Sequence, residues 1–110
     1  MRYVLMISEG RDEPALEGCA AWAEEMEARG VLREILRLQR SETARTVQVR
    51  QDEVLPYDGP FAETREQVGG LAVIECADLD EAVDVAAAHP WAKVGAIEVR
   101  PIWDREPLDL

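Results

Sequence analysis

The residues best suited to chemistry gather in one stretch, 58–66, with the sequence DGPFAETRE. Asp58 stands directly before Gly59 and Pro60, two residues that fix a bend in the chain. A loop carboxylate beside an apolar strand is partly desolvated, which raises its pKa toward the range useful for general acid–base catalysis. The same three residues are also good turn chemistry, in which the carboxylate only caps backbone amides. The sequence leaves both roles of Asp58 open.

His89 is the single histidine of the chain and stands just before Pro90. At the expected end of a helix, a histidine can satisfy exposed carbonyls and, as a cation, favour the helix dipole. The alternative is a proton shuttle, which requires Asp58 and His89 to lie within a hydrogen bond or one water of a common ligand. We therefore treat both residues as candidate catalytic groups.

Four further residues are candidates for ligand contact. Arg65 and Glu66 belong to a charged run with Glu63, and the run is either a solvated set of paired charges or a place where Arg65 anchors an anionic ligand. Tyr3 and Tyr57 are the other two, although tyrosines at such positions more often pack than bind.

The sequence offers no set of residues for a metal or a cofactor. One histidine and two distant cysteines, Cys19 and Cys76, do not make a ligand set, and the cysteines are not in a CxxC arrangement. We expect both to be thiols in a reducing compartment, with no disulfide between them. A P-loop, a dinucleotide-binding fingerprint and a GxSxG elbow are all missing.

Composition bounds the possible partners. The 110 residues include 12 basic and 23 acidic side chains, for a formal net charge of -11. Such a charge repels phosphate backbones and anionic lipids, so we expect neither nucleic acid nor a membrane as partner. The apolar run at 4–7 is too short for a signal peptide or a membrane span. We expect one domain, 1–110, in the cytoplasm, with its acidity spread over a solvated surface.

Hydrophobic periodicity predicts the elements that must position these residues. Strands are expected at 3–7, 31–38, 46–50, 54–55, 71–74 and 97–99, with a polar turn at 51–53 and a long irregular stretch at 56–70. A first helix should begin near 12–14 and end at Arg29-Gly30, and a second should begin at Asp78 and end before Pro90.

The expected buried faces of the two helices follow the same spacing. In the first helix they are Leu16, Cys19, Ala20, Ala23 and Met26, and in the second Leu79, Ala82, Val83 and Ala86. The order of elements is the split βαβ pattern of the ferredoxin-like α+β fold, with both helices on one face of an antiparallel sheet. Because the strands at 3–7 and 71–74 are apolar on both sides, the open face is expected to be buried in an isologous homodimer.

The stretch 58–70 resembles the DGPFAETKE motif of the YCII-related family. The opening strand MRYVLMI, the segment DLDEA at 78–82 and the segment GAIEVRPI at 95–102 are similar to the family's flanking elements, so nearly the whole chain is covered. The resemblance implies a ferredoxin-like protomer and a dimeric α+β barrel. It also implies enzymes with an Asp–His pair in a cleft in the wider family, and an association with extracytoplasmic-function sigma factors in the DGPF branch.

Two departures from the usual family pattern bear on ligand choice. The segment 31–38 is leucine-rich and charged where relatives commonly carry glycines and prolines, so a cleft lined by it would have a different preference. Arg65 stands where lysine is frequent, which keeps the charge but offers a flat fork suited to a carboxylate.

Two functions of different classes are compatible with these observations. The first is a cytoplasmic homodimer that binds a small polar organic molecule in a cleft beside the DGPF loop. If it is an enzyme, which the sequence leaves open, the chemistry is cofactor-independent proton transfer, isomerisation or elimination, with Asp58 as base and Arg65 orienting an anion. The alternative is a non-catalytic regulatory module, linked to a sigma-factor system, whose acidic surface docks a basic partner.

Overall fold

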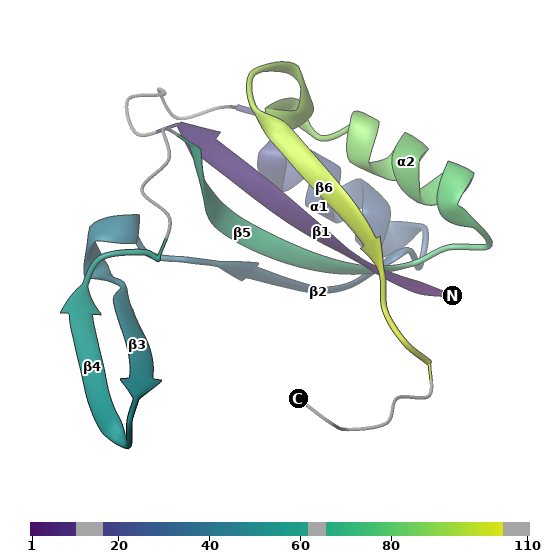
Figure 1. Cartoon of the computed structure of the whole chain (residues 1–110). Helices are drawn as coiled ribbons and strands as arrows, with labels where there is room; N and C mark the ends of the chain where they lie inside the picture. The colour runs from purple at the N-terminus through teal and green to yellow at the C-terminus, as the bar shows by residue number, and fades with distance from the viewer. Residues whose placement is uncertain (11–16, 62–65, 105–110) are drawn as a thin grey trace.

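The computed structural model describes residues 1–10, 17–61 and 66–104 (Figure 1). Its regular elements are, in chain order, β1 Arg2–Gly10, α1 Cys19–Ala28, β2 Leu32–Arg37, the 3-10 helix η1 Ser41–Thr43, β3 Arg45–Arg50, β4 Glu53–Asp58, β5 Glu66–Glu75, α2 Leu79–Ala87, the 3-10 helix η2 Pro90–Lys93 and β6 Ala96–Pro101. None of the helices in this part of the chain is long and apolar enough to span a membrane.

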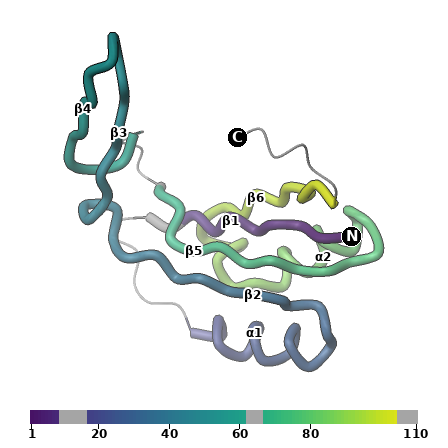
Figure 2. Tube along the Cα trace, turned by 90° about the horizontal axis from the view of Figure 1, so that it is seen from below, coloured from purple at the N-terminus to yellow at the C-terminus, as the bar shows by residue number. Residues whose placement is uncertain are grey.

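Four strands form the main sheet in the order β2-β5-β1-β6, and every neighbouring pair is antiparallel. Two helices, α1 and α2, pack on one side of it, and Figure 2 shows the strands from the other side. This is the predicted α+β architecture, consistent with the ferredoxin-like fold. The predicted strand at 31–38 is confirmed as β2, although the sequence pattern there was compatible with helix.

The core lies between the sheet and the two helices. Tyr3 and Leu5 of β1 stand directly opposite Ile74 and Ala72 of β5, so these four buried side chains share one face of the sheet. Against them pack Trp22 and Met26 of α1 and Ala82, Val85 and Ala86 of α2. The opposite face carries Val4, Met6, Leu71 and Val73, which are half-buried, and neither helix lies on it. We call these four residues the open sheet face.

The buried faces of both helices differ from the sequence-based expectation. In α1 the indole of Trp22 is buried while Ala20 is exposed, and Leu16 lies outside the described residues. In α2 the exposed residues include Leu79 and Val83, and the buried stripe contains Val85 instead. Each helix turns a different stripe of apolar residues toward the sheet than the expected one, and the two stripes have the same periodicity. In α2, Ala82 and Ala86 belong to both stripes.

The helix boundaries follow local capping chemistry. At the start of α2 the Glu81 amide donates to Asp78 Oδ1 and the Ala77 amide donates to Glu81 Oε2, both at 2.9 Å, so the expected capping box is formed with Ala77 as the second donor. After α1, Gly30 has φ +74°, the left-handed conformation that ends many helices. The predicted start of the first helix at 12–14 lies outside the described residues.

Strands β3 and β4 form a separate two-stranded hairpin that projects beyond the end of the main sheet, on the side away from α2 (Figure 1). Gln51 and Asp52 join them with φ values of 52° and 64°, the pattern of a type I′ turn. The polar turn was predicted, but residues 56–58, predicted as irregular, extend β4 instead. The hairpin raises the radius of gyration to 16.0 Å, against about 13 Å for a compact chain of this size.

Candidate functional site

Asp58 is the last residue of β4 and stands opposite Arg45, the first residue of β3. The Arg45 guanidinium donates to Asp58 Oδ1, and the two side chains are 71% and 79% exposed. Within one protomer the carboxylate is therefore in contact with water and paired, rather than partly desolvated beside an apolar strand. Its donor among the described residues is a side chain and not the backbone amide that a turn cap uses.

Gly59 ties the Asp58 position to the start of the hairpin. Its amide donates to the Ala44 carbonyl at 2.7 Å, and its own carbonyl accepts from Thr46 Oγ1 at 2.8 Å. Gly59 has φ +95°, and an added Cβ would meet nothing within 4 Å. Glycine is thus required by the backbone conformation and not by crowding. The two hydrogen bonds hold Asp58 close to the chain that leaves η1.

An open hollow of about 460 Å³ lies between the end of β2 and η1. Its lining comes from one continuous segment: Arg37, Leu38, Gln39, Arg40, Glu42 and Thr43. On one side the Leu38 amide donates to the Gly69 carbonyl of β5 at 2.9 Å, and on the other Thr43 leads through Ala44 to the Gly59 contact. The hollow therefore lies at the junction of main sheet and hairpin, bordered by both ends of the segment 59–69.

The charges at the hollow favour an anion. Arg40 Nε contacts Glu42 Oε1 at 2.7 Å, whereas Arg37 makes no ion pair with a described residue. Two arginines and one glutamate thus line the hollow, in a chain whose formal net charge is -11. A guanidinium presents a planar fork of donors that matches a carboxylate or phosphate. The arrangement can hold and orient a small organic anion.

His89 lies elsewhere, buried between α1 and the end of α2. Its ring is 4.8 Å from that of Trp22 in an edge-to-face arrangement, and its Nδ1 accepts a hydrogen bond from the Trp91 amide at 3.1 Å. Burial lowers the pKa of His89. The imidazole is therefore a neutral N-cap of η2, and the interpretation of His89 as a cation at a helix end is wrong.

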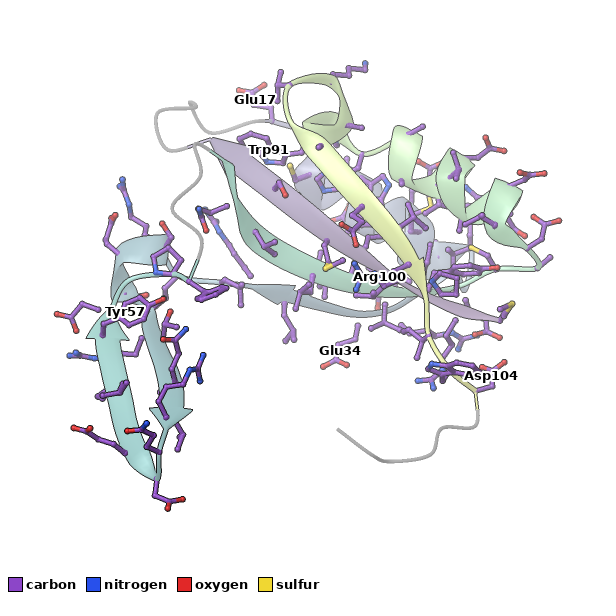
Figure 3. The ribbon with its side chains drawn as sticks, viewed as in Figure 1. Glu17, Glu34, Tyr57, Trp91, Arg100 and Asp104 are labelled. Carbon is purple, nitrogen blue, oxygen red and sulfur yellow. The ribbon has the colours of Figure 1, made fainter. Side chains whose placement is uncertain are left out.

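The structure does not bring Asp58 and His89 together within one protomer. Tyr57, next to Asp58, lies on the hairpin, while Trp91, two residues beyond His89, lies in η2 at the end of the main sheet, near Glu17 (Figure 3). A shared cleft for the two residues stays a prediction. The fold brings Asp58 against Arg45, and the Gly59 amide bonds to Ala44, the residue after the segment that lines the hollow.

Comparison with known proteins assigns the chain to a family. The family model of the YCII-related domain matches residues 1–106, which include the main sheet, both helices and the hairpin. The chain belongs to the YCII-related family. It is also similar to a protein of Rhizobium meliloti (strain 1021), described as uncharacterized, with 36% identity over 107 residues that cover 94% of this chain and 85% of that protein.

The structure places the four predicted ligand-contact residues of this YCII-related protein in different environments, and one of them lies outside the described residues. Tyr3 is buried in the core, where its hydroxyl donates to Met1 Sδ at 3.4 Å and burial raises its pKa. Tyr57 is partly exposed on β4. Arg65 lies outside the described residues, and Glu66 begins β5 with its side chain undescribed. Tyr3 thus packs, as the alternative interpretation held, and the other three stay predictions.

Sequence reasoning did not single out Arg37, Arg40 or Arg45. A signal for them was present, because these three arginines fall within nine residues of an otherwise acidic chain, and Arg37 belongs to the segment 31–38 that departs from the usual family pattern. The sequence could not show that the chain at η1 bends so that Ala44, the residue after η1, bonds to Gly59. Only the fold shows that Arg37 and Arg40 line one hollow close to this contact.

The described residues contain no group of three or more His, Cys, Asp or Glu side chains that could hold a metal ion. Cys19 and Cys76 are both thiols, as expected, with no disulfide joining them. Burial is the main cause that raises the pKa of the Cys76 thiol, which makes it a poor nucleophile.

Proposed function

We propose that this YCII-related protein is a cytoplasmic homodimer of the DGPF branch that binds a small, anionic, polar organic molecule in the hollow lined by 37–43. The observation that carries the proposal is the position of Arg37 and Arg40 in an open hollow whose last lining residue, Thr43, precedes Ala44, the hydrogen-bond partner of Gly59. Arginine forks bind and orient a carboxylate, and a carboxylate beside them can exchange a proton with the bound molecule.

The chemistry that suits this arrangement is cofactor-independent proton transfer. The guanidinium groups of Arg37 and Arg40 hold the ligand's carboxylate, and Asp58 takes a proton from an atom near that carboxylate. In an isomerisation Asp58 returns the proton to a neighbouring atom, so that one proton and one double bond move and no oxidant or reductant is consumed. Arg65 and Glu66, at the other end of the motif, are the residues expected to contact the rest of the ligand.

Binding is tested with small carboxylates as probes, because they carry the group that the hollow should recognise. A series of acetate, malonate, succinate and benzoate is titrated into ¹⁵N-labelled protein and followed by amide chemical shifts. Shifts are expected in 37–44 and at Gly59 for at least one probe. Arg37→Gln should weaken that binding about tenfold or more, because a charge-assisted hydrogen bond is worth about 1.5–3 kcal/mol.

Arg33→Gln is the matched control, since Arg33 lies on the same strand, is exposed and does not line the hollow. It should leave the affinity unchanged. Shifts confined to another part of the molecule, or equal affinities for Arg37→Gln and wild type, would remove the proposed site.

The role of Asp58 is tested separately from binding. Asp58→Asn keeps the size of the side chain, so the carboxylate probe should still bind while any turnover found for the protein is lost. The free energy of unfolding should fall by less than about 1 kcal/mol, because exposed ion pairs contribute about 0.2–1 kcal/mol. Turnover that survives in Asp58→Asn would exclude Asp58 as the base.

A second candidate function is favoured by the charge of the helices. Over their full lengths α1 and α2 hold six carboxylates and no basic residue. Such a surface suits a basic partner protein, which fits a regulatory module linked to an extracytoplasmic-function sigma factor. Calorimetric titration with the sigma factor encoded nearest to this chain tests it, and Asp80→Asn with Asp84→Asn should weaken the binding. No heat of binding at micromolar concentrations would leave ligand binding as the function.

A further inference from the structure

The hairpin presents one strongly apolar face that nothing in the described chain covers. Val49 pairs with Val54, and Val47 pairs with Pro56, so these four side chains lie on the same face of β3–β4. The valines at 47, 49 and 54 are 61%, 54% and 61% exposed. We call these four residues the valine face. An isolated two-stranded hairpin is marginally stable in water, so a face of this kind calls for a partner surface.

A second uncovered apolar surface lies on the same side of the molecule. It is the open sheet face of Val4, Met6, Leu71 and Val73, extended at the edge by the exposed side chain of Leu36 and bordered by Glu34, Glu98 and Arg100, which the register places on the same face. The hairpin extends past one end of the main sheet and away from α2 (Figure 1). The open sheet face also points away from the helices. A molecule that covers the open sheet face is therefore positioned to meet the hairpin as well.

The distribution of charge identifies the molecule that fits. The six strands hold six arginines and seven carboxylates, whereas the two α-helices hold six carboxylates and no basic residue. Two copies of this acidic chain would repel each other through their helices, but the strands are nearly neutral. A basic partner would find its complement on the helices and not here. The surface with least repulsion between identical copies is the one that carries both uncovered apolar faces.

We propose that the β3–β4 hairpin is a dimerisation arm whose valine face packs on a second copy of this chain. In a two-fold dimer the two open sheet faces cover each other, and each hairpin extends along the partner, so the contact is isologous. This inference rests on the homodimer of the proposed function and adds the element that forms its contact. Asp58 and Arg45 are the first pair of the same hairpin, and the neighbouring Gly59 bonds to Ala44, next to the segment that lines the hollow, so docking of the arm would hold this junction in place.

The arm is tested by sedimentation velocity at micromolar concentration. Wild type should sediment as a dimer, and the double variant Val47→Glu, Val49→Glu as a monomer, with its dissociation constant raised at least a hundredfold. Val83→Glu is the matched control, because Val83 is 48% exposed on α2 and outside both apolar faces. It should remain dimeric. Circular dichroism checks that each variant is folded.

A dimeric double variant would overturn the arm while leaving a dimer through the sheet face. A monomeric wild type would overturn both the arm and the homodimer. The carboxylate titration on that monomer then shows whether ligand binding fails with them.

Wild-type protein gives a second test that does not depend on folded variants. Equal amounts of ¹³C-valine-labelled and unlabelled protein are mixed, and an isotope-filtered NOE experiment selects contacts between copies. Methyl groups of Val47, Val49 and Val54 are expected to show contacts to the unlabelled copy. Contacts between copies that involve only Val4 and Val73 would overturn the arm.

Discussion

The Trp22 indole donates a hydrogen bond to a carbonyl near the end of α2 that has no backbone donor among the described residues. Its Nε1 donates to the Val85 carbonyl at 3.0 Å in the buried interior. The backbone cannot serve this carbonyl, because the Ala88 amide bonds to Asp84 and the His89 amide turns back to Ala86. Trp22→Phe keeps an aromatic ring in the core but removes the donor.

The cost of Trp22→Phe follows from this geometry. A buried carbonyl left without a partner costs about 1–3 kcal/mol. The smaller ring also loses part of its edge contact with His89, and such aromatic pairs contribute about 0.5–1.5 kcal/mol. We expect the free energy of unfolding to fall by about 2–4 kcal/mol.

Urea unfolding followed by circular dichroism measures this change, with all proteins at one concentration so that association contributes equally. Trp103→Phe is the control, because Trp103 is 76% exposed and its replacement should change stability by less than about 0.5 kcal/mol. A Trp22→Phe protein within 0.5 kcal/mol of wild type, on the scale of a surface change, would refute the assigned role of the indole.

Two further predictions concern buried positions near the end of α2 and the start of β6. Burial lowers the pKa of His89, so its stabilising effect should be complete above about pH 6.5 and be lost as pH falls toward the lower folded pKa, by about 1.4 kcal/mol per unit of depression. His89→Asn keeps an acceptor for the Trp91 amide without titrating, so between pH 7.5 and 5 it should lose less stability than wild type in urea unfolding; equal losses would contradict the argument. Gly95→Ala would place a Cβ 2.6 Å from the Ser8 carbonyl, and thermal unfolding should show a loss of about 1–3 kcal/mol, whereas the exposed Ala96→Ser should change little and equal stability of the two would contradict the clash.

Most of the fold could be predicted because its signals are local. Alternation at 46–50 and the polar residues at 51–53 are enough to place the hairpin, and Asp78 with Glu81 marks the start of α2. The face that α2 buries could not be predicted, because stripes beginning at Leu79 and at Ala82 have the same periodicity and both contain apolar residues. Only packing against the sheet selects the second stripe.

The site was harder to predict than the fold because it depends on contacts between distant segments. The motif at 58–66 directed attention to Asp58, but its partner Arg45 is set by the hairpin register, and the arginines of the hollow by the turn at η1. His89 was paired with Asp58 on residue type alone. Its actual neighbours, the ring of Trp22 and the backbone amide of Trp91, explain why it is neutral and buried.

The segment 39–68 leaves and re-enters the main sheet at almost the same point. The Leu38 amide donates to the Gly69 carbonyl at 2.9 Å, which closes the excursion at its base. Among the residues that the structure describes, all buried hydrophobic side chains of the core come from outside it, between Tyr3 and Val31 or between Ala72 and Trp91. Substitutions and length changes in this excursion can therefore accumulate during evolution with little cost to the core. What the excursion recognises can therefore change without a change in the four-stranded sheet and its two helices.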